Sequence, residues 1–317
     1  MEKDIFSKAG INFLRLKSST GLETTFSDVG AGIYSLSYKG KQLLYVPDDL
    51  EYYSRFYFGK TVGPMAGRIK GARYIVGGKE YRLDANEGAN ALHSSSIAIH
   101  DKRFALNLSD TYHSACAEYS LSLENLGVAY PGKLDVKVTY LLSDDSPMLL
   151  LVYEATPELD SPINLTNHAY FNLGLDDVSG VYLRLNAHRH ATYDAELIPQ
   201  GDVACEKEFD FSSGMEIGKW ACSPLVESCK RLQGYDHAFI LDRRDFLTPA
   251  AEAKGNGITM TLYTSSDALQ VFTMPKKGGG YLNFTLEEVK YPSDPKSILV
   301  RGGTTAVSRH IYAFKEE

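Results

Sequence analysis

The chain has 317 residues, a formal net charge of −7 and 44% hydrophobic residues. A nucleic-acid binder would show a basic surplus, and the longest compact apolar run, residues 148–153, is too short to span a bilayer. The N-terminal segment lacks the apolar core of a secretory signal. We therefore expect a cytoplasmic protein, monomeric or homodimeric, with an ordinary hydrophobic core and without nucleic-acid or membrane partners.

Short strands separated by tight turns fill the N-terminal third of the chain. Residues 33–38 and 42–46 flank Gly40, and residues 74–76 and 79–83 flank a Gly-Gly pair. Glycine supplies the positive φ that a two-residue hairpin turn needs. Two β-hairpins are predicted here.

The same strand pattern continues to the C-terminus. Residues 134–140 alternate apolar with mostly polar side chains, which predicts a strand with one buried face. The apolar run 148–153 suits a more buried strand. Residues 258–263 and 269–274 form another predicted strand pair, and residues 307–314 a closing strand.

Helical periodicity is scarce. Only residues 247–254, with Pro249 near their start, suggest one short helix. The 21 tyrosines, together with many threonines, valines and isoleucines, suit pleated surfaces. We predict an all-β fold, a large antiparallel β-sandwich with very little helix, formed by residues 1–317 as a single domain.

Several common site motifs are missing. Gly30-Ala31-Gly32 lacks the third glycine of a dinucleotide-binding loop, and no Walker A, HExxH or GxSxG motif occurs. His188 and His190 would share one face of a strand and could ligate a metal, but no cysteine or third histidine stands nearby. We favour a half-exposed strand surface there and expect no metal.

The four cysteines form no CxxC pair, and so long a chain needs no disulfide frame. They are predicted to be reduced, buried thiols: Cys116, Cys205, Cys222 and Cys229.

Two polar segments stand in otherwise apolar surroundings. His168 lies among asparagines and aromatics in residues 164–173 (NLTNHAYFNL), a composition that implies a hydrogen-bonded network. Glu287 and Glu288 are consecutive in a predicted strand, so one can face a pocket while the other meets solvent. Taken singly, a satisfied structural histidine and two solvated strand-end charges are the favoured explanations of these segments.

Together, in order, five segments resemble the aldose 1-epimerase (galactose mutarotase) family. The third of them is the most specific. The segments are residues 62–69, 90–93, 164–173, 234–237 and 286–287, the last with Pro292 five residues beyond the glutamate. The resemblance runs from about residue 20 to the C-terminus.

The resemblance implies an antiparallel β-sandwich enzyme that interconverts the α and β anomers of a free aldose, without metal, nucleotide or redox cofactor. His168 is similar to the family's general acid, which protonates the ring oxygen. Glu287 is similar to its general base, which takes the proton from the C1 hydroxyl. Arg68, His93 and Asp236 match positions that hold sugar hydroxyls.

This chemistry explains the residue types. Opening a hemiacetal removes a proton from the C1 hydroxyl and adds one to the ring oxygen, so an acid and a base must reach two oxygens on one carbon. A histidine serves as acid if a carboxylate or hydroxyl network keeps it protonated. Tyr170 and Phe171 are candidates to pack against the apolar face of the sugar, with ordinary core packing as the alternative.

The sequence departs from the family pattern mostly around the expected pocket rim. The departing residues are Pro64, Gly67, Ser94, Ser95, His100 and, near the C-terminus, Gly302. The added serine hydroxyls could contact a modified sugar, so the substrate stays open.

Two alternatives follow. An epimerase of a phosphorylated hexose would need basic groups converging on the pocket, with Lys60, Arg68, Lys70 and Arg73 as candidates. A non-catalytic sugar-binding module could use the same fold, although binding alone requires neither acid nor base.

Overall fold

The structure, a computed structural model, describes residues 1–111, 113–220, 233–242, 245–291 and 295–317. Cys222, Cys229 and Pro292 lie outside these residues. Cys116 and Cys205 carry free thiols and are half-buried rather than fully buried. Within the described ranges, no helix has the length and apolar character needed to cross a membrane.

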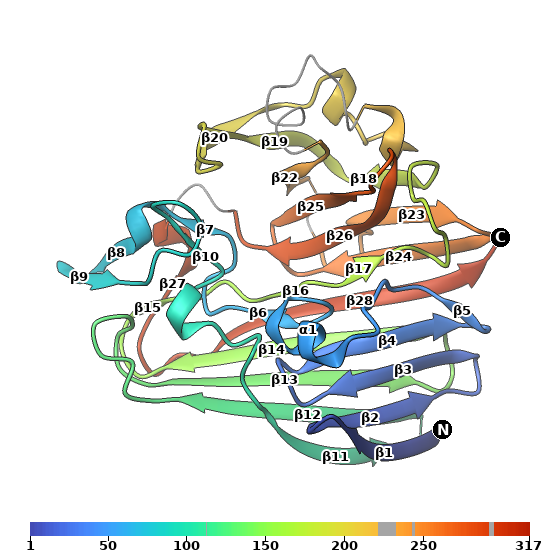
Figure 1. The fold of residues 1–317 in the computed structure, drawn as a ribbon, viewed down its shortest axis with the longest axis horizontal. Helices are drawn as coiled ribbons and strands as arrows, with labels where there is room; N and C mark the ends of the chain where they lie inside the picture. The colour runs from blue at the N-terminus through green and yellow to red at the C-terminus, as the bar shows by residue number, and fades with distance from the viewer. Residues whose placement is uncertain (112, 221–232, 243–244, 292–294) are drawn as a thin grey trace.

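The predicted all-β architecture is confirmed, with three large antiparallel sheets (Figure 1). In spatial order the nine-stranded sheet contains β11 (Ala105–Thr111), β12 (Ser114–Leu123), β13 (Leu134–Ser143), β14 (Met148–Pro157), β28 (Ala306–Glu316), β24 (Ile258–Thr264), β23 (Ala251–Gly255), β18 (Tyr182–Leu185) and β21 (Met215–Glu216). The six-stranded sheet contains β17 (Tyr170–Phe171), β26 (Tyr281–Val289), β25 (Ala268–Pro275), β22 (Asp236–Leu241), β19 (Ala187–Tyr193) and β20 (Pro199–Ala204).

The remaining elements are shorter. The five-stranded sheet contains β1 (Glu2–Lys8), β2 (Ile11–Lys17), β3 (Leu22–Ser27), β4 (Gly32–Tyr38) and β5 (Lys41–Gln42). Two-stranded pairs are β6 (Thr61–Val62) with β16 (Thr166–Asn167), β7 (Arg68–Ile69) with β10 (Ala91–Leu92), β8 (Arg73–Val76) with β9 (Lys79–Arg82), and β15 (Ser161–Pro162) with β27 (Leu299–Val300). The described helices are α1 (Leu50–Arg55) and 3-10 turns at Lys70–Ala72, Ser95–Ile97, Lys207–Phe209, Ile217–Lys219 and Pro295–Ile298.

The nine-stranded sheet packs against the other two large sheets. Phe26 of β3 stacks on Tyr140 of β13 with ring centroids 4.3 Å apart, which joins the five-stranded sheet to one half of the nine-stranded sheet. Phe171 of β17 meets Tyr312 of β28 at 5.3 Å, which joins the six-stranded sheet to the other half. One hydrophobic cluster of the described residues runs through both contacts.

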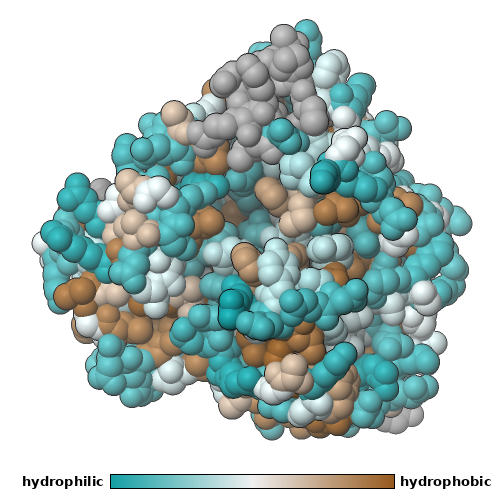
Figure 2. Space-filling view, in the orientation of Figure 1, coloured by the Kyte–Doolittle hydropathy of each residue, from teal (hydrophilic) through white to brown (hydrophobic). Residues whose placement is uncertain are grey.

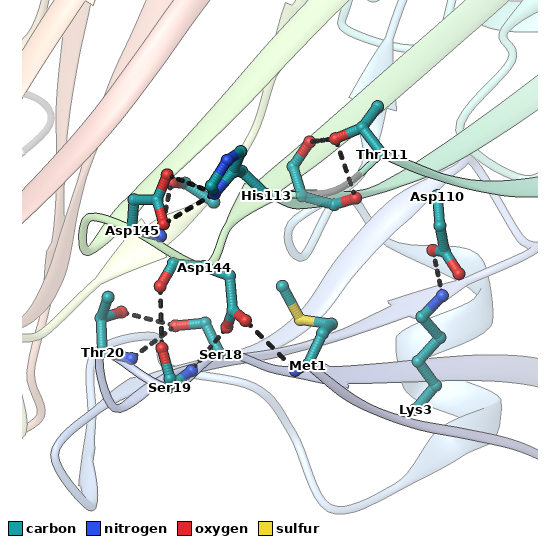
Figure 3. A network of polar contacts seen from close by, with 12 residues as sticks. Met1, Lys3, Ser18, Ser19, Thr20, Asp110, Thr111, His113, Asp144 and Asp145 are labelled. Carbon is teal, nitrogen blue, oxygen red and sulfur yellow. Dashed lines mark hydrogen bonds and ion pairs between the residues drawn. The ribbon is translucent and has the colours of Figure 1, made fainter.

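Polar contacts of the N-terminal segment bind it to the nine-stranded sheet (Figure 3). The Met1 amino group lies 3.3 Å from an Asp144 carboxylate oxygen in the β13–β14 turn, and Lys3 forms an ion pair with Asp110 of β11. Ser19 donates to Asp144 through its amide at 2.7 Å and through its hydroxyl at 2.8 Å. These contacts join the N-terminal strands to β11 and to the β13–β14 turn.

Most predicted strands are confirmed. Residues 74–76 and 79–83 correspond to the hairpin β8–β9, and Gly77 and Gly78 at its turn have φ angles of 57° and 79°. Residues 134–140 and 148–153 lie within β13 and β14, which pair as antiparallel neighbours.

The closing strand predicted at residues 307–314 is confirmed, because these residues lie within β28. Another expectation was met only in part. The hairpin predicted at Gly40 is present as β4–β5, although β5 is only two residues long.

Two predictions about the C-terminal half were wrong. The predicted helix 247–254 is absent, because Ala251 and Ala253 are buried while Glu252 and Lys254 are half-buried, a period of two that places β23 beside β24. Residues 258–263 and 269–274 are strands, but they do not pair with each other. The turn between them carries the chain from the nine-stranded to the six-stranded sheet.

Candidate active site

A cavity of about 210 Å³ opens beside the six-stranded sheet. Figure 2 shows this face of the molecule hollowed between the part that holds β7 and β10 and the six-stranded sheet. All five residues singled out in the sequence line the cavity: Arg68, His93, His168, Asp236 and Glu287. The structure therefore brings together groups that lie up to 219 residues apart in the chain (287 − 68).

Neighbouring strands place these side chains. Glu287 lies on β26 opposite Gln270 of β25, and Asp236 begins β22 on the other side of β25. Arg68 lies on β7, opposite Leu92 of β10, and His93 follows directly after β10. His168 follows β16, and its amide donates to the Lys60 carbonyl at 2.9 Å. The cavity therefore has one wall of sheet and one wall of short strand pairs.

His168 and Glu287 face each other across the cavity. Nε2 of His168 lies 3.5 Å from Oε1 of Glu287, and the two residues are 6% and 4% exposed. The Thr285 hydroxyl donates to the same Glu287 oxygen at 3.0 Å. Nδ1 of His168 has no hydrogen-bond partner among the described residues. Both groups are positioned to exchange protons with a ligand in the cavity.

Burial controls the ionisation of this pair. Desolvation lowers the pKa of His168 to about 4, with the nearby Asp236 carboxylate opposing the shift. Desolvation raises the pKa of Glu287 to about 8, and Asp236 and Glu288 add to that shift. Between these values the pair holds one proton, which lies on Glu287, so the expectation that a surrounding network keeps His168 protonated is not met.

Arg68 is held by two carboxylates. Its Nε and Nη2 donate to the two oxygens of Glu87 at 2.6 and 2.9 Å, and Nη1 donates to Asp236 at 3.1 Å. Gln270 donates to the other Asp236 oxygen at 2.6 Å. The guanidinium is thus charge-compensated and rigid, and its remaining N–H groups can point to a ligand.

His93 acts through a defined tautomer. Its Nδ1 accepts from the Gly67 amide at 3.2 Å, while the His93 amide donates to the Gly67 carbonyl at 3.0 Å. Burial and the neighbouring His168 and Arg68 hold its pKa well below the usual range. A neutral ring that accepts at Nδ1 carries its proton on Nε2, so His93 can donate to a sugar oxygen.

Aromatic rings enclose the imidazole of His168. Tyr57 stacks on it with ring centroids 5.5 Å apart, and Tyr170 lies at 4.8 Å. Both tyrosines line the cavity. Phe171 does not, because alternation along β17 turns it into the core against Phe284 and Tyr312. The prediction for Phe171 was therefore wrong, and its alternative of core packing holds.

Several further expectations need correction. Glu288 does not meet solvent: it is 0% exposed, because the far face of β26 packs on the nine-stranded sheet. His188 and His190 do not share a face, because a bulge in β19 leaves His188 exposed beside Asp242 while His190 stacks on Phe209 at 3.9 Å.

Within the described ranges, no group of three or more His, Cys, Asp or Glu side chains could hold a metal ion.

The altered rim residues have mainly structural partners. Ser94 is fully buried, and its hydroxyl accepts from the Met65 amide at 2.7 Å and donates to the Met65 carbonyl at 3.1 Å. It is therefore not available to a modified sugar. His100 packs its ring 4.5 Å from Tyr57 and so supports the aromatic wall from behind.

The sequence interpretation missed Glu87, Gln270 and Tyr57. Glu87 lies in the Glu-Gly turn just before the Asn-Ala-Leu-His segment, and its position beside that segment was an available signal. Gln270 is the only uncharged polar side chain in the apolar stretch 269–272, which was a second signal. Tyr57 stands among other aromatics and carried none.

Comparison with known proteins agrees with this geometry. The solved structure of a galactose 1-epimerase from Lactobacillus acidophilus superposes with a TM-score of 0.90 at 24% identity, covering 99% of both chains. An aldose epimerase homologue from C. elegans superposes with a TM-score of 0.84 at 22% identity, over 96% of this chain and 99% of that one. The fold is therefore a sandwich of the galactose mutarotase-like class.

Sequence relationships narrow the class to a family. The family model described as aldose 1-epimerase matches residues 12–306. Galactose mutarotase from Sus scrofa is 33% identical over 239 residues, which cover 73% of this chain and 65% of that protein. Aldose 1-epimerase from Escherichia coli K12 is 28% identical over 292 residues, covering 84% and 79%. The chain belongs to the aldose 1-epimerase family. It spans about two-thirds of the length of the mammalian galactose mutarotases it matches.

Proposed function

We propose that this protein is an isomerase that interconverts the α and β anomers of a free monosaccharide. The observation that carries the proposal is the 3.5 Å approach of His168 Nε2 and Glu287 Oε1 inside a cavity whose other polar groups suit hydroxyls. An acid and a base held this close can reach the ring oxygen and the C1 hydroxyl of one sugar.

The proposed reaction uses the single proton of the pair. With that proton on His168, the Glu287 carboxylate takes the proton of the C1 hydroxyl while the imidazolium gives its proton to the ring oxygen. The C1–O5 bond breaks and the open aldehyde forms. After rotation about C1–C2, the hydroxyl at C5 attacks the other face, returns its proton to His168, and the new C1 oxygen receives the proton from Glu287. No atom or charge is left over.

The remaining groups would orient the ring. His93 would donate from Nε2, Asp236 would accept from hydroxyls, and Arg68 would donate with the N–H groups that Glu87 and Asp236 leave free. Tyr57 and Tyr170 offer flat surfaces to the apolar face of the sugar. This set of hydroxyl-binding donors and acceptors, in which the charge of Arg68 is already compensated, suits an uncharged polyol.

A phosphorylated substrate is not favoured by the cavity. Among its described lining residues Arg68 is the only lysine or arginine, and two carboxylates already compensate it. The Lys60 ammonium is turned away and donates to the Ser54 carbonyl at 2.8 Å. Lys70 and Arg73 are exposed and pair with Asp194 and Glu80. A phosphate would meet more negative than positive charge.

A non-catalytic sugar-binding module is also less favoured. Burying two titratable groups at 4% and 6% exposure is costly, and binding a neutral sugar requires neither. Perturbed groups facing each other in a cavity are typical of catalytic sites.

Polarimetry or NMR on freshly dissolved α-anomers of galactose, glucose and xylose tests the proposal. We expect faster equilibration with the wild-type protein and a loss of about 10²-fold or more in Glu287→Gln and His168→Asn proteins that keep their fold. Wild-type rates in both variants would refute the acid–base assignment. Acceleration of a sugar phosphate alone would establish the phosphorylated alternative.

A further inference from the structure

Glu288 occupies the core side of the strand that carries Glu287. Side chains alternate along β26, so Glu287 faces the cavity and Glu288 faces the nine-stranded sheet. Its exposure is 0%. The groups nearest its carboxyl include the hydroxyl of Tyr312 on β28 and the main-chain amide of Asn167. Asn167 is the last residue of β16, which pairs with β6.

Unpartnered oxygens gather around this carboxyl. Both Glu288 oxygens, the hydroxyls of Tyr153 and Tyr312, and Oδ1 of Asn167 make no hydrogen bond of ordinary geometry with the described residues. All four residues are at most 1% exposed. We call these four residues the core-side cluster. Buried oxygens are costly unless they find partners, and these groups are the partners within each other's reach.

The core-side cluster is joined by the chain to both members of the proposed catalytic pair. Asn167 directly precedes His168, and Glu288 directly follows Glu287. The pair itself has few other restraints, because His168 Nδ1 is unpartnered and Glu287 is held by the Thr285 hydroxyl. Because β16 packs against β26, a hydrogen bond between the Asn167 main-chain amide and Glu288 would hold, from behind, the two backbone segments whose separation sets the 3.5 Å approach.

We propose that Glu288 is a positioning residue that links the Asn167 amide to the Tyr312 hydroxyl and thereby fixes the spacing between His168 and Glu287. The inference rests on the proposed function only for its kinetic consequence. The link itself is a property of the fold, and it can be measured without substrate.

The charge state of Glu288 suits this role. Burial raises its pKa to about 8, so at neutral pH the carboxyl is uncharged and can both donate and accept. The ionisable groups that face it are Tyr312 on β28, Tyr153 on β14, Tyr140 on β13 and Glu287 on its own strand. His310 of β28 lies farther back, with its ring 5.4 Å from that of Tyr153. The Tyr312 hydroxyl and the Asn167 amide would favour a carboxylate, but the desolvation of the buried group outweighs them.

Two substitutions separate the link from mere filling of space. Glu288→Gln keeps the shape and the ability to donate and accept, whereas Glu288→Leu keeps the volume and removes both. We expect Glu288→Leu to lower kcat by about 10²-fold, the effect of a misplacement of about 1 Å, with KM within about twofold of wild type. Glu288→Gln should restore kcat to within about threefold of the wild-type value. Tyr312→Phe, which removes one hydroxyl, should lower kcat in the same direction.

A substrate-free measurement distinguishes failure of this inference from failure of the proposed function. NMR signals of the His168 imidazole should shift in Glu288→Leu and Tyr312→Phe and stay near wild type in Glu288→Gln. Leu142→Ala, a fully buried change in β13, serves as a control for lost stability and should leave them unmoved. If Glu288→Leu and Tyr312→Phe keep wild-type His168 signals, or if Leu142→Ala shifts them equally, the inference is wrong. An inactive wild-type protein would refute the proposed function alone.

Discussion

The pH dependence of the reaction is the sharpest consequence of the buried pair. The proposed mechanism needs one proton on His168 and Glu287 together, and burial sets the limits at about 4 for His168 and about 8 for Glu287. Raising the pH through the upper limit removes that proton and leaves no acid. We therefore expect kcat/KM to be flat from about pH 5 to 7, to fall to about half at pH 8, and to about one-tenth at pH 9.

The assay is polarimetric mutarotation of α-galactose from pH 4 to 10 in buffers of constant ionic strength. Rates without protein are subtracted, because free sugars equilibrate spontaneously. Glu287→Gln is the matched control: it should lose the alkaline fall along with most of its activity. A half-point near the ordinary histidine value of about 6.5, or a wild-type rate that keeps rising to pH 10, would contradict the shared-proton mechanism.

Three further predictions follow from single contacts. Glu87→Gln should raise KM about fivefold with little change in kcat, because Arg68 loses a charged fork partner outside the reacting atoms; steady-state kinetics at pH 7 check this, and an unchanged KM would contradict it. Gly59→Ala should destabilise the protein by about 3 kcal/mol in urea unfolding, because φ is +66° and a Cβ would lie 2.0 Å from the Ile33 carbonyl oxygen; Gly40→Ala, with φ of +80° and nothing within 4 Å, controls for backbone strain alone. The folded state raises the pKa of Glu288 from 4.5 to about 8, so the stabilising contribution of Glu288 is present below about pH 4.5 and is lost as the pH rises through 8. The melting temperature of Glu288→Gln relative to wild type should therefore increase across that window. A constant difference would show that Glu288 does not titrate there.

The sequence predicted the fold class from local signals, which are period-two alternation in β13, an apolar run in β14 and a Gly-Gly turn between β8 and β9. Strand partners were less accessible: residues 258–263 and 269–274 are adjacent in sequence yet belong to different layers, and a turn of three residues does not reveal which way the chain continues. The helix α1 was missed although Asp49 caps it by accepting from the amides of Glu51 and Tyr52, a pattern visible in the sequence.

The site, like the fold, was predicted in its residues but not in their surroundings. The resemblance of five ordered segments to the aldose 1-epimerase family selected His168, Glu287, Arg68, His93 and Asp236, and the fold brings all five to one cavity. What sequence could not supply was the environment. It placed Glu288 in solvent, because alternation says that two neighbours face opposite ways but not that both faces of β26 are covered.

That double burial connects the chemistry to the fold. A strand at the surface of a sandwich could present a catalytic glutamate, but that carboxylate would keep an ordinary pKa. It would stay ionised and would not share a proton with a neighbouring histidine. Because β26 lies between the cavity and the nine-stranded sheet, Glu287 is desolvated without a cation of its own: the nearest guanidinium, that of Arg68, is already compensated by Glu87 and Asp236. The compensation of the Arg68 charge by Glu87 and Asp236 therefore has two effects. A phosphate would find no free counter-charge in the cavity. Glu287 also has little positive charge to lower its pKa, so it holds the proton that the pair exchanges with His168. The same ion pairs of Arg68 therefore favour a neutral substrate and prepare the acid–base pair.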